Sequence, residues 1–238
     1  MECVKIANAL RAEIEAYAVR MPVSNPLFVE ASNGTFAPAS MLTYLANIRY
    51  LVGYTKTSLS HARDRARALG DERLAEHYEH KRVEELGHEV WADDDIVRLS
   101  KASAIAPTAD ILPAIRDLVR FLEETIEEDP ALYLAYALFA EYLTVILGPA
   151  WLRLLEERCG IPRSSMTVIG NHIELDREHA EEAFDLIDLL VADPRKLARM
   201  REVLQASLAN FDRFCGEVTE RATAKESRTY VDRGASAA

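Results

Sequence analysis

The sequence is poor in cysteine and has no pattern that predicts a β-sheet. Cys3, Cys159 and Cys215 lie far apart among 238 residues and form no CxxC pair. An odd count without pairing signatures is typical of proteins from a reducing compartment. Alternating apolar and polar runs, internal repeats and a glycine-rich phosphate loop are also lacking. We therefore expect an all-α protein from the cytoplasm.

Positive charge is scarce. Lys and Arg number 28 against 39 Asp and Glu, which gives a formal net charge of −11. This balance argues against nonspecific nucleic-acid binding. The first fifteen residues carry five charged side chains and do not resemble a signal peptide. With 49% hydrophobic and 28% charged residues, the chain has the composition of a soluble globular protein.

Only one long hydrophobic run is present. Residues 131–152 read ALYLAYALFAEYLTVILGPAWL, with Glu141 as the single charge. The length is close to the roughly 20 residues of a membrane-spanning helix. A carboxylate in mid-bilayer costs about 2.5–3.5 kcal/mol on insertion scales, so we predict a core helix and no membrane span.

Apolar periodicity, with proline and glycine at the boundaries, predicts a bundle of about seven helices. We expect one domain over residues 1–222 and a disordered tail over 223–238. The predicted helices cover residues 2–20, 38–69, 71–102, 108–128, 130–159, 162–191 and 194–222.

The helix predicted over 162–191 contains the sequence NHIELDREH. Its His172, Asp176 and His179 fall within about 60° of one another around a helix, on the side of the apolar residues that follow. Glu174 and Glu178 point the other way. Buried polar groups need partners, so this HxxxDxxH set indicates a metal site or a polar core network.

Two other helices direct acidic or imidazole groups inward. In the helix over 71–102, Glu85 and His88 form an ExxH pair that can serve one metal ion, with Glu84 as the alternative to Glu85. Glu141 lies on an apolar face, where a lone carboxylate is costly. It is protonated, bound to metal, or paired with a base such as Lys81.

The three sets together favour metal binding over a core network. They supply three carboxylates and three imidazoles without a thiolate, a donor set that suits Fe, Mn or Zn rather than an iron–sulfur cluster. Helix pairs that supply ExxH-type sets are typical of di-iron and di-manganese carboxylate bundles.

The order and spacing of these motifs resemble the heme-oxygenase-like diiron oxidases. Glu141 follows His88 by 53 residues and precedes the HxxxDxxH motif by 31, and EHYEHKRVEELGHEVWADDD is typical of iron-containing redox members. The resemblance implies a seven-helix heme-oxygenase-like bundle, a non-heme centre of two iron ions, and O2 as co-substrate. The implied metal ligands are Glu85 (or Glu84), His88, Glu141, His172, Asp176 and His179.

The sequence departs from the family where some members place a glutamate seven residues before the histidine. Lys81 stands there, and no Asp or Glu occurs between Ser40 and His61 to supply a carboxylate from the preceding helix. Lys81 and Tyr54 are candidate catalytic residues. The candidate substrate-binding residues are Tyr44, Tyr50, His61, Trp151 and Arg153.

The function that the resemblance implies is an O2-activating oxidase or oxygenase of biosynthesis. Its substrate would be a small metabolite with an amine or carboxylate, and the reaction an oxidative C–C cleavage, a decarboxylation or an N-oxygenation. The sequence does not decide whether the metal is Fe or Mn, whether an external donor supplies electrons, or whether the protein forms a homodimer. The alternatives are a non-enzymatic helical bundle and a cofactorless or thiaminase-like relative.

Overall fold

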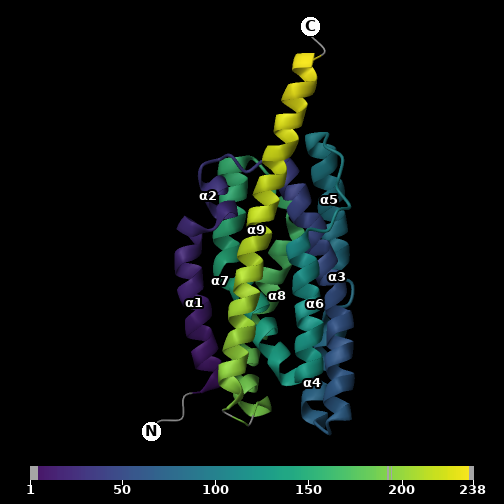
Figure 1. Ribbon diagram of the computed structural model, residues 1–238, viewed down its shortest axis with the longest axis vertical. Coiled ribbons are helices and arrows are strands. Elements are labelled where there is room, and N and C mark those ends of the chain that lie inside the picture. Colours follow the sequence, from purple (N-terminus) through teal and green to yellow (C-terminus); the bar gives the residue numbers. More distant parts are fainter. Residues whose placement is uncertain (1–4, 192, 194, 236–238) are drawn as a thin grey trace.

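The computed structural model describes residues 5–191, 193 and 195–235, and the side chains among them except those of 178, 181, 185 and 222–235. These residues form nine α-helices, two short 3-10 helices and no strand, which confirms the all-α prediction (Figure 1). The α-helices are α1 Ile6–Ser24, α2 Pro26–Ser32, α3 Pro38–Ala68, α4 Glu72–Glu84, α5 Glu89–Ser103, α6 Pro113–Glu128, α7 Tyr133–Cys159, α8 Thr167–Leu190 and α9 Lys196–Ala235.

Local signals set most helix boundaries. Proline occupies the first turn of α2, α3 and α6, where its missing N–H removes no hydrogen bond. The side chain of Asp71 accepts a hydrogen bond from the backbone N–H of Leu74 and caps α4. Gly160 ends α7 in the left-handed conformation. The long helix predicted over 38–69 is confirmed.

The helix predicted over 71–102 is wrong in one respect, because the chain breaks into α4 and α5. Gly87 has a φ of +88°, a conformation that glycine adopts without strain. Glu85 is the C-cap of α4 and His88 is the N-cap of α5, so both residues stand at the turn. The break, together with the short α2, raises the count above the seven helices expected.

Helix α7 is the apolar centre of the bundle. Pro130–Cys159 is long and apolar enough to cross a membrane, but 56% of its most apolar window is buried, as in the core helix of a soluble protein. It packs closely against α8: a Cβ on Gly148 would lie 2.6 Å from the side chain of Ile173. This contact fixes the polar residues of α8 against the face of α7 that carries Glu141.

Helix α9 continues to Ala235, although the sequence predicts its end near residue 222. Its C-terminal part extends past the other helices at the top of the bundle (Figure 1). Residues 236–238 of the predicted tail lie outside the described residues.

Candidate metal centre

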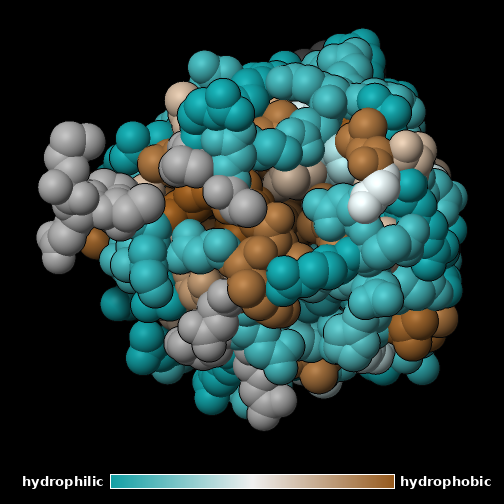
Figure 2. Space-filling model, turned by 90° about the horizontal axis from the view of Figure 1, so that it is seen from below, coloured by the Kyte–Doolittle hydropathy of each residue, from teal (hydrophilic) through white to brown (hydrophobic). Residues whose placement is uncertain are grey.

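An elongated cavity of about 270 Å³ runs between the helices. Most of its lining is apolar or aromatic. Seen from below, apolar side chains are visible within a hollow that polar residues surround (Figure 2). The acidic, basic and imidazole side chains in its lining are His77, His80, Lys81, Glu85, Glu141, His172, Asp176, His179 and Glu182.

Three predicted ligands form the first cluster of the candidate centre. Glu85, His88 and His172 each offer one ligand atom, and these atoms all lie within 4.8 Å of one another. His88 Nδ1 is 3.2 Å from Glu85 Oε2, and the two imidazole rings are 5.1 Å apart. Two imidazoles and one carboxylate are a common ligand set of catalytic metal sites.

The start of α8 fixes the orientation of His172. Its Nδ1 lies 2.6 Å from the carbonyl oxygen of Val168, which can only accept, so Nδ1–H donates and Nε2 is left as the ligand atom. The N–H of Val168 in turn donates to the carboxylate of Asp95 at 2.8 Å. Asp95, fully buried on α5, thereby positions the first turn of α8 and the imidazole above it.

Trp91 supports both imidazoles of this cluster. Its ring stacks on His88 with centroids 4.2 Å apart and meets His172 edge-on at 5.5 Å. Burial alone would raise the pKa of Glu85, but His88 and His172 outweigh burial and lower it. Sequence reasoning missed Trp91, although its place three residues after His88 could have indicated a contact.

The remaining predicted ligands form a second cluster around Lys81. The ammonium Nζ lies 2.9 Å from Glu141 Oε1 and 3.2 Å from Glu84 Oε2. His179 is 3.6 Å from Glu84 Oε2 through Nε2 and 3.6 Å from Asp176 Oδ1 through Nδ1. The pairing of Lys81 with Glu141 confirms the ion-pair alternative that the sequence left open.

Burial and charge shape the pKa values in the second cluster. Burial raises the pKa of Glu141, and Lys81 opposes this rise. Burial favours the neutral amine of Lys81, but the carboxylates outweigh it and raise its pKa, so Lys81 is a cation. The carboxylate of Asp176, next to the imidazole, raises the pKa of His179. Burial, with the nearby Lys81, lowers the pKa of His77 to about 4.

The residues present fit a metal ion. His88 Nδ1, in the first cluster, is a buried polar atom without a hydrogen-bond partner. The side chain of His88 is more than nine-tenths buried. Buried polar atoms are nearly always satisfied, so this atom indicates a missing partner. Oxygen and imidazole donors suit Fe, Mn or Zn.

The candidate substrate-binding and catalytic residues fall into two groups, those that line the cavity and those that do not. Tyr44 and Trp151 line the cavity, with their ring centroids 6.3 Å apart. Tyr50 and Tyr54 stack on each other at 6.1 Å and do not line it, and Arg153 is exposed. The structure therefore does not bring these last three residues to the centre.

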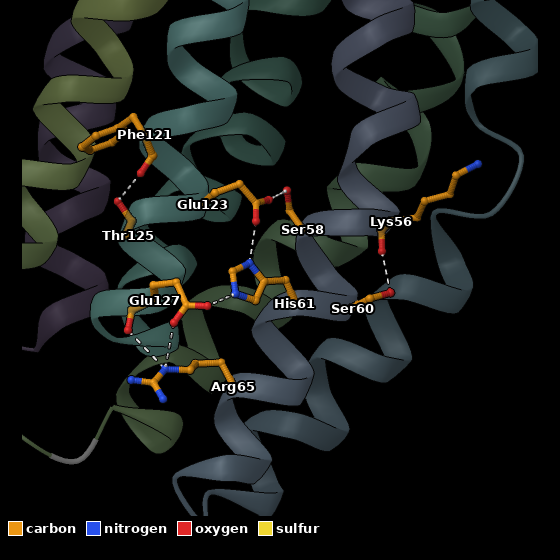
Figure 3. A network of polar contacts seen from close by, with 9 residues as sticks. All are labelled: Lys56, Ser58, Ser60, His61, Arg65, Phe121, Glu123, Thr125 and Glu127. Atoms are coloured by element: carbon orange, nitrogen blue, oxygen red, sulfur yellow. Dashed lines mark hydrogen bonds and ion pairs between the residues drawn. The ribbon is translucent and has the colours of Figure 1, made fainter.

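His61 is also placed elsewhere, between α3 and α6 (Figure 3). Its Nδ1 lies 2.5 Å from Glu123 Oε2 and its Nε2 lies 2.6 Å from Glu127 Oε1. Ser58 donates to Glu123 at 3.0 Å. His61 does not line the cavity, so it is not positioned to bind a substrate there.

Glu174 and Glu178 of α8 are the acidic residues predicted to face outward. Glu174 is exposed, as predicted. The side chain of Glu178 lies outside the described residues.

No protein-family model matches the chain, and no curated protein matches it. A domain of unknown function with a heme oxygenase-like fold from Shewanella denitrificans is 19% identical, with a TM-score of 0.81 over 92% of this chain and 94% of that one. A CADD-like protein of unknown function from Nostoc punctiforme is 14% identical, with TM-scores of 0.68 and 0.66 in two crystal structures. These cover 91% and 92% of this chain and 98% and 97% of theirs. The chain therefore has a heme-oxygenase-like fold, and the predicted fold is confirmed.

Proposed function

We propose that this protein is a non-heme iron oxidase or oxygenase that uses O2 to oxidise a small metabolite. The observation that carries the proposal is the convergence of Glu85, His88 and His172 beside a largely apolar cavity. A metal ligand set beside a cavity that can hold a substrate is the arrangement that a metalloenzyme needs.

Glu85, His88 and His172 would hold the first iron. Iron bound there would supply the redox chemistry that activates O2. The hydrogen bond from His172 to Val168 keeps the ligand nitrogen directed into the cluster. For two irons, the second would take its ligands from Glu141, Asp176, His179 and Glu84.

The cavity supports a small substrate with an apolar body and one charged group. Its volume is close to the lower end of the range for ligand pockets, about 300–1,000 Å³. Aromatic residues such as Tyr44 and Trp151 in its wall would pack against the apolar body of the substrate. At the polar end, Lys81 can pair with a carboxylate, and Glu141 or Asp176 with an amine. We expect oxidative C–C cleavage, decarboxylation or N-oxygenation, with electrons from an external donor.

Anaerobic loading with Fe(II) tests the proposal. The loaded protein should retain iron on desalting, consume O2 when exposed to air, and show a transient change in visible absorbance. His172→Ala should lose iron retention and O2 uptake. His61→Ala is the matched control, because it removes an imidazole outside the cavity and should retain both.

A wild-type protein that retains no Fe(II) or Mn(II) would contradict the proposal. The polar residues would then form a core network held by the Lys81–Glu141 pair, in a bundle without redox function.

A further inference from the structure

The second cluster already contains a cation, the ammonium of Lys81. From this we infer that the protein binds one metal ion tightly, at Glu85, His88 and His172, and that Lys81 occupies the place of a second ion. The inference rests on the proposed function, since it assumes that the first cluster binds metal.

The contacts of Lys81 are those that a second metal ion would need. Its nitrogen touches the carboxylates of Glu141 and Glu84, at 2.9 and 3.2 Å. Asp176 and His179, the other ligands of a second ion, lie beside the same carboxylates. An ion bound by Glu141 would therefore lie within a few ångströms of a positive charge.

The charge count is compatible with the same occupancy. Four carboxylates meet at the two clusters, those of Glu84, Glu85, Glu141 and Asp176. One divalent ion together with Lys81 offsets three of their four negative charges. Two divalent ions would offset all four without Lys81, and would leave an excess positive charge with it. The ammonium thus supplies half of the positive charge that a second divalent ion would bring to these carboxylates.

Lys81 is held in this position. Its side chain is 13% exposed, and leaving would break two ion pairs and strand buried carboxylates. Glu84 is also held from the other side, because its Oε1 lies 3.1 Å from Nε2 of His80. One oxygen of Glu84 therefore contacts His80 and the other contacts Lys81.

Metal stoichiometry tests the inference without reference to activity. Anaerobic titration calorimetry and elemental analysis with Mn(II) and Fe(II) should give one tightly bound ion per chain in the wild type. Lys81→Met removes the charge and should bind two. Repulsion at a few ångströms predicts a second-site affinity at least ~1,000-fold weaker in the wild type than in Lys81→Met.

Two control variants make the result specific to the charge of Lys81, and a spectrum of the wild type adds an independent measurement. Lys81→Arg keeps the charge and should bind one ion. Lys56→Met removes a lysine that pairs with Glu89 outside the centre and should also bind one. The EPR spectrum of Mn(II)-loaded wild type, which needs no variant, should show uncoupled ions rather than an exchange-coupled pair.

Each possible result of these measurements either supports the one-ion inference or overturns it. Two tightly bound, coupled ions in the wild type would overturn the inference and leave the proposed function intact. One ion in both wild type and folded Lys81→Met would also overturn it, because the ammonium would not be what excludes the second ion. No bound metal in the wild type would instead overturn the proposed function. If Lys81→Met does not fold, the wild-type EPR spectrum decides.

Discussion

Asp95 is the residue whose replacement tests how the fold positions the centre. It is fully buried, and its carboxylate accepts hydrogen bonds from the Thr167 hydroxyl at 2.7 Å and the Val168 N–H at 2.8 Å. It also accepts from Arg98 at 3.1 Å. Asp95→Ala would leave the first two donors without this partner at the start of α8.

The expected loss can be worked from these contacts. Hydrogen bonds to charged groups contribute about 1.5–3 kcal/mol each, and loss of a helix cap typically costs about 1 kcal/mol. Arg98 keeps Asp94 and the carbonyl of Ser164 as partners, so its share is small. We expect Asp95→Ala to lower the free energy of unfolding by about 3 kcal/mol. For a chain of this size the Tm should fall by about 6–12 °C.

Urea unfolding followed by circular dichroism measures this change. Asp94→Ala is the matched control, because the neighbouring carboxylate is exposed and makes only a surface pair, with Arg98. It should change stability by less than about 0.5 kcal/mol. Asp95→Ala should also weaken metal binding by about 10–100-fold, since Val168 would no longer be held beneath His172. A loss below about 0.5 kcal/mol for Asp95→Ala would refute the argument.

Three further predictions concern packing, pH and metal. Gly148→Ala should destabilise the protein by about 1–3 kcal/mol in thermal melts, because its Cβ would overlap Ile173; an unchanged Tm would contradict this. Burial would lower the pKa of His61, but Glu127 and Glu123 outweigh burial and raise it. The wild type should therefore be most stable relative to His61→Gln below about pH 6.5, and this advantage should fall as the pH rises through the folded-state pKa. A difference in unfolding free energy that does not change with pH would contradict this. Anaerobic Mn(II) at 100 times its Kd should stabilise the wild type by about 2.7 kcal/mol.

The sequence predicted the buried face of α8 because that face follows simple helical periodicity. His172, Asp176 and His179 recur at the spacing of one helix face, and all three line the cavity. Glu141 was predicted for the same reason, as a single acid on an apolar helix. Its partner Lys81 followed from the cost of burying a carboxylate alone.

The turn at Gly87 could not be predicted from the same periodicity. A single glycine within a helical pattern is usually tolerated, and only the backbone shows that this one takes a positive φ. The two glutamates diverge at the end of α4: Glu85 lies beside His88, while Glu84 meets Lys81. A continuous helix therefore gave no means of choosing between the two glutamates.

The polar stripe on α3 misled for a different reason. Tyr50, Tyr54 and His61 share one side of a helix, but a sequence does not show which neighbour that side meets. His61 meets the acidic residues of α6, and the two tyrosines meet each other. Tyr44 lines the cavity from another side of α3, together with Ile48 and Thr55.

The most direct test of the central claim is to locate the iron in a crystal grown or soaked anaerobically with Fe(II). Anomalous scattering at the iron edge should give a peak bonded to the side chains of Glu85, His88 and His172, and none of equal height between Glu141 and His179. A crystal without an iron peak at the first cluster, or with iron only at a surface site such as that of His61, would contradict the account.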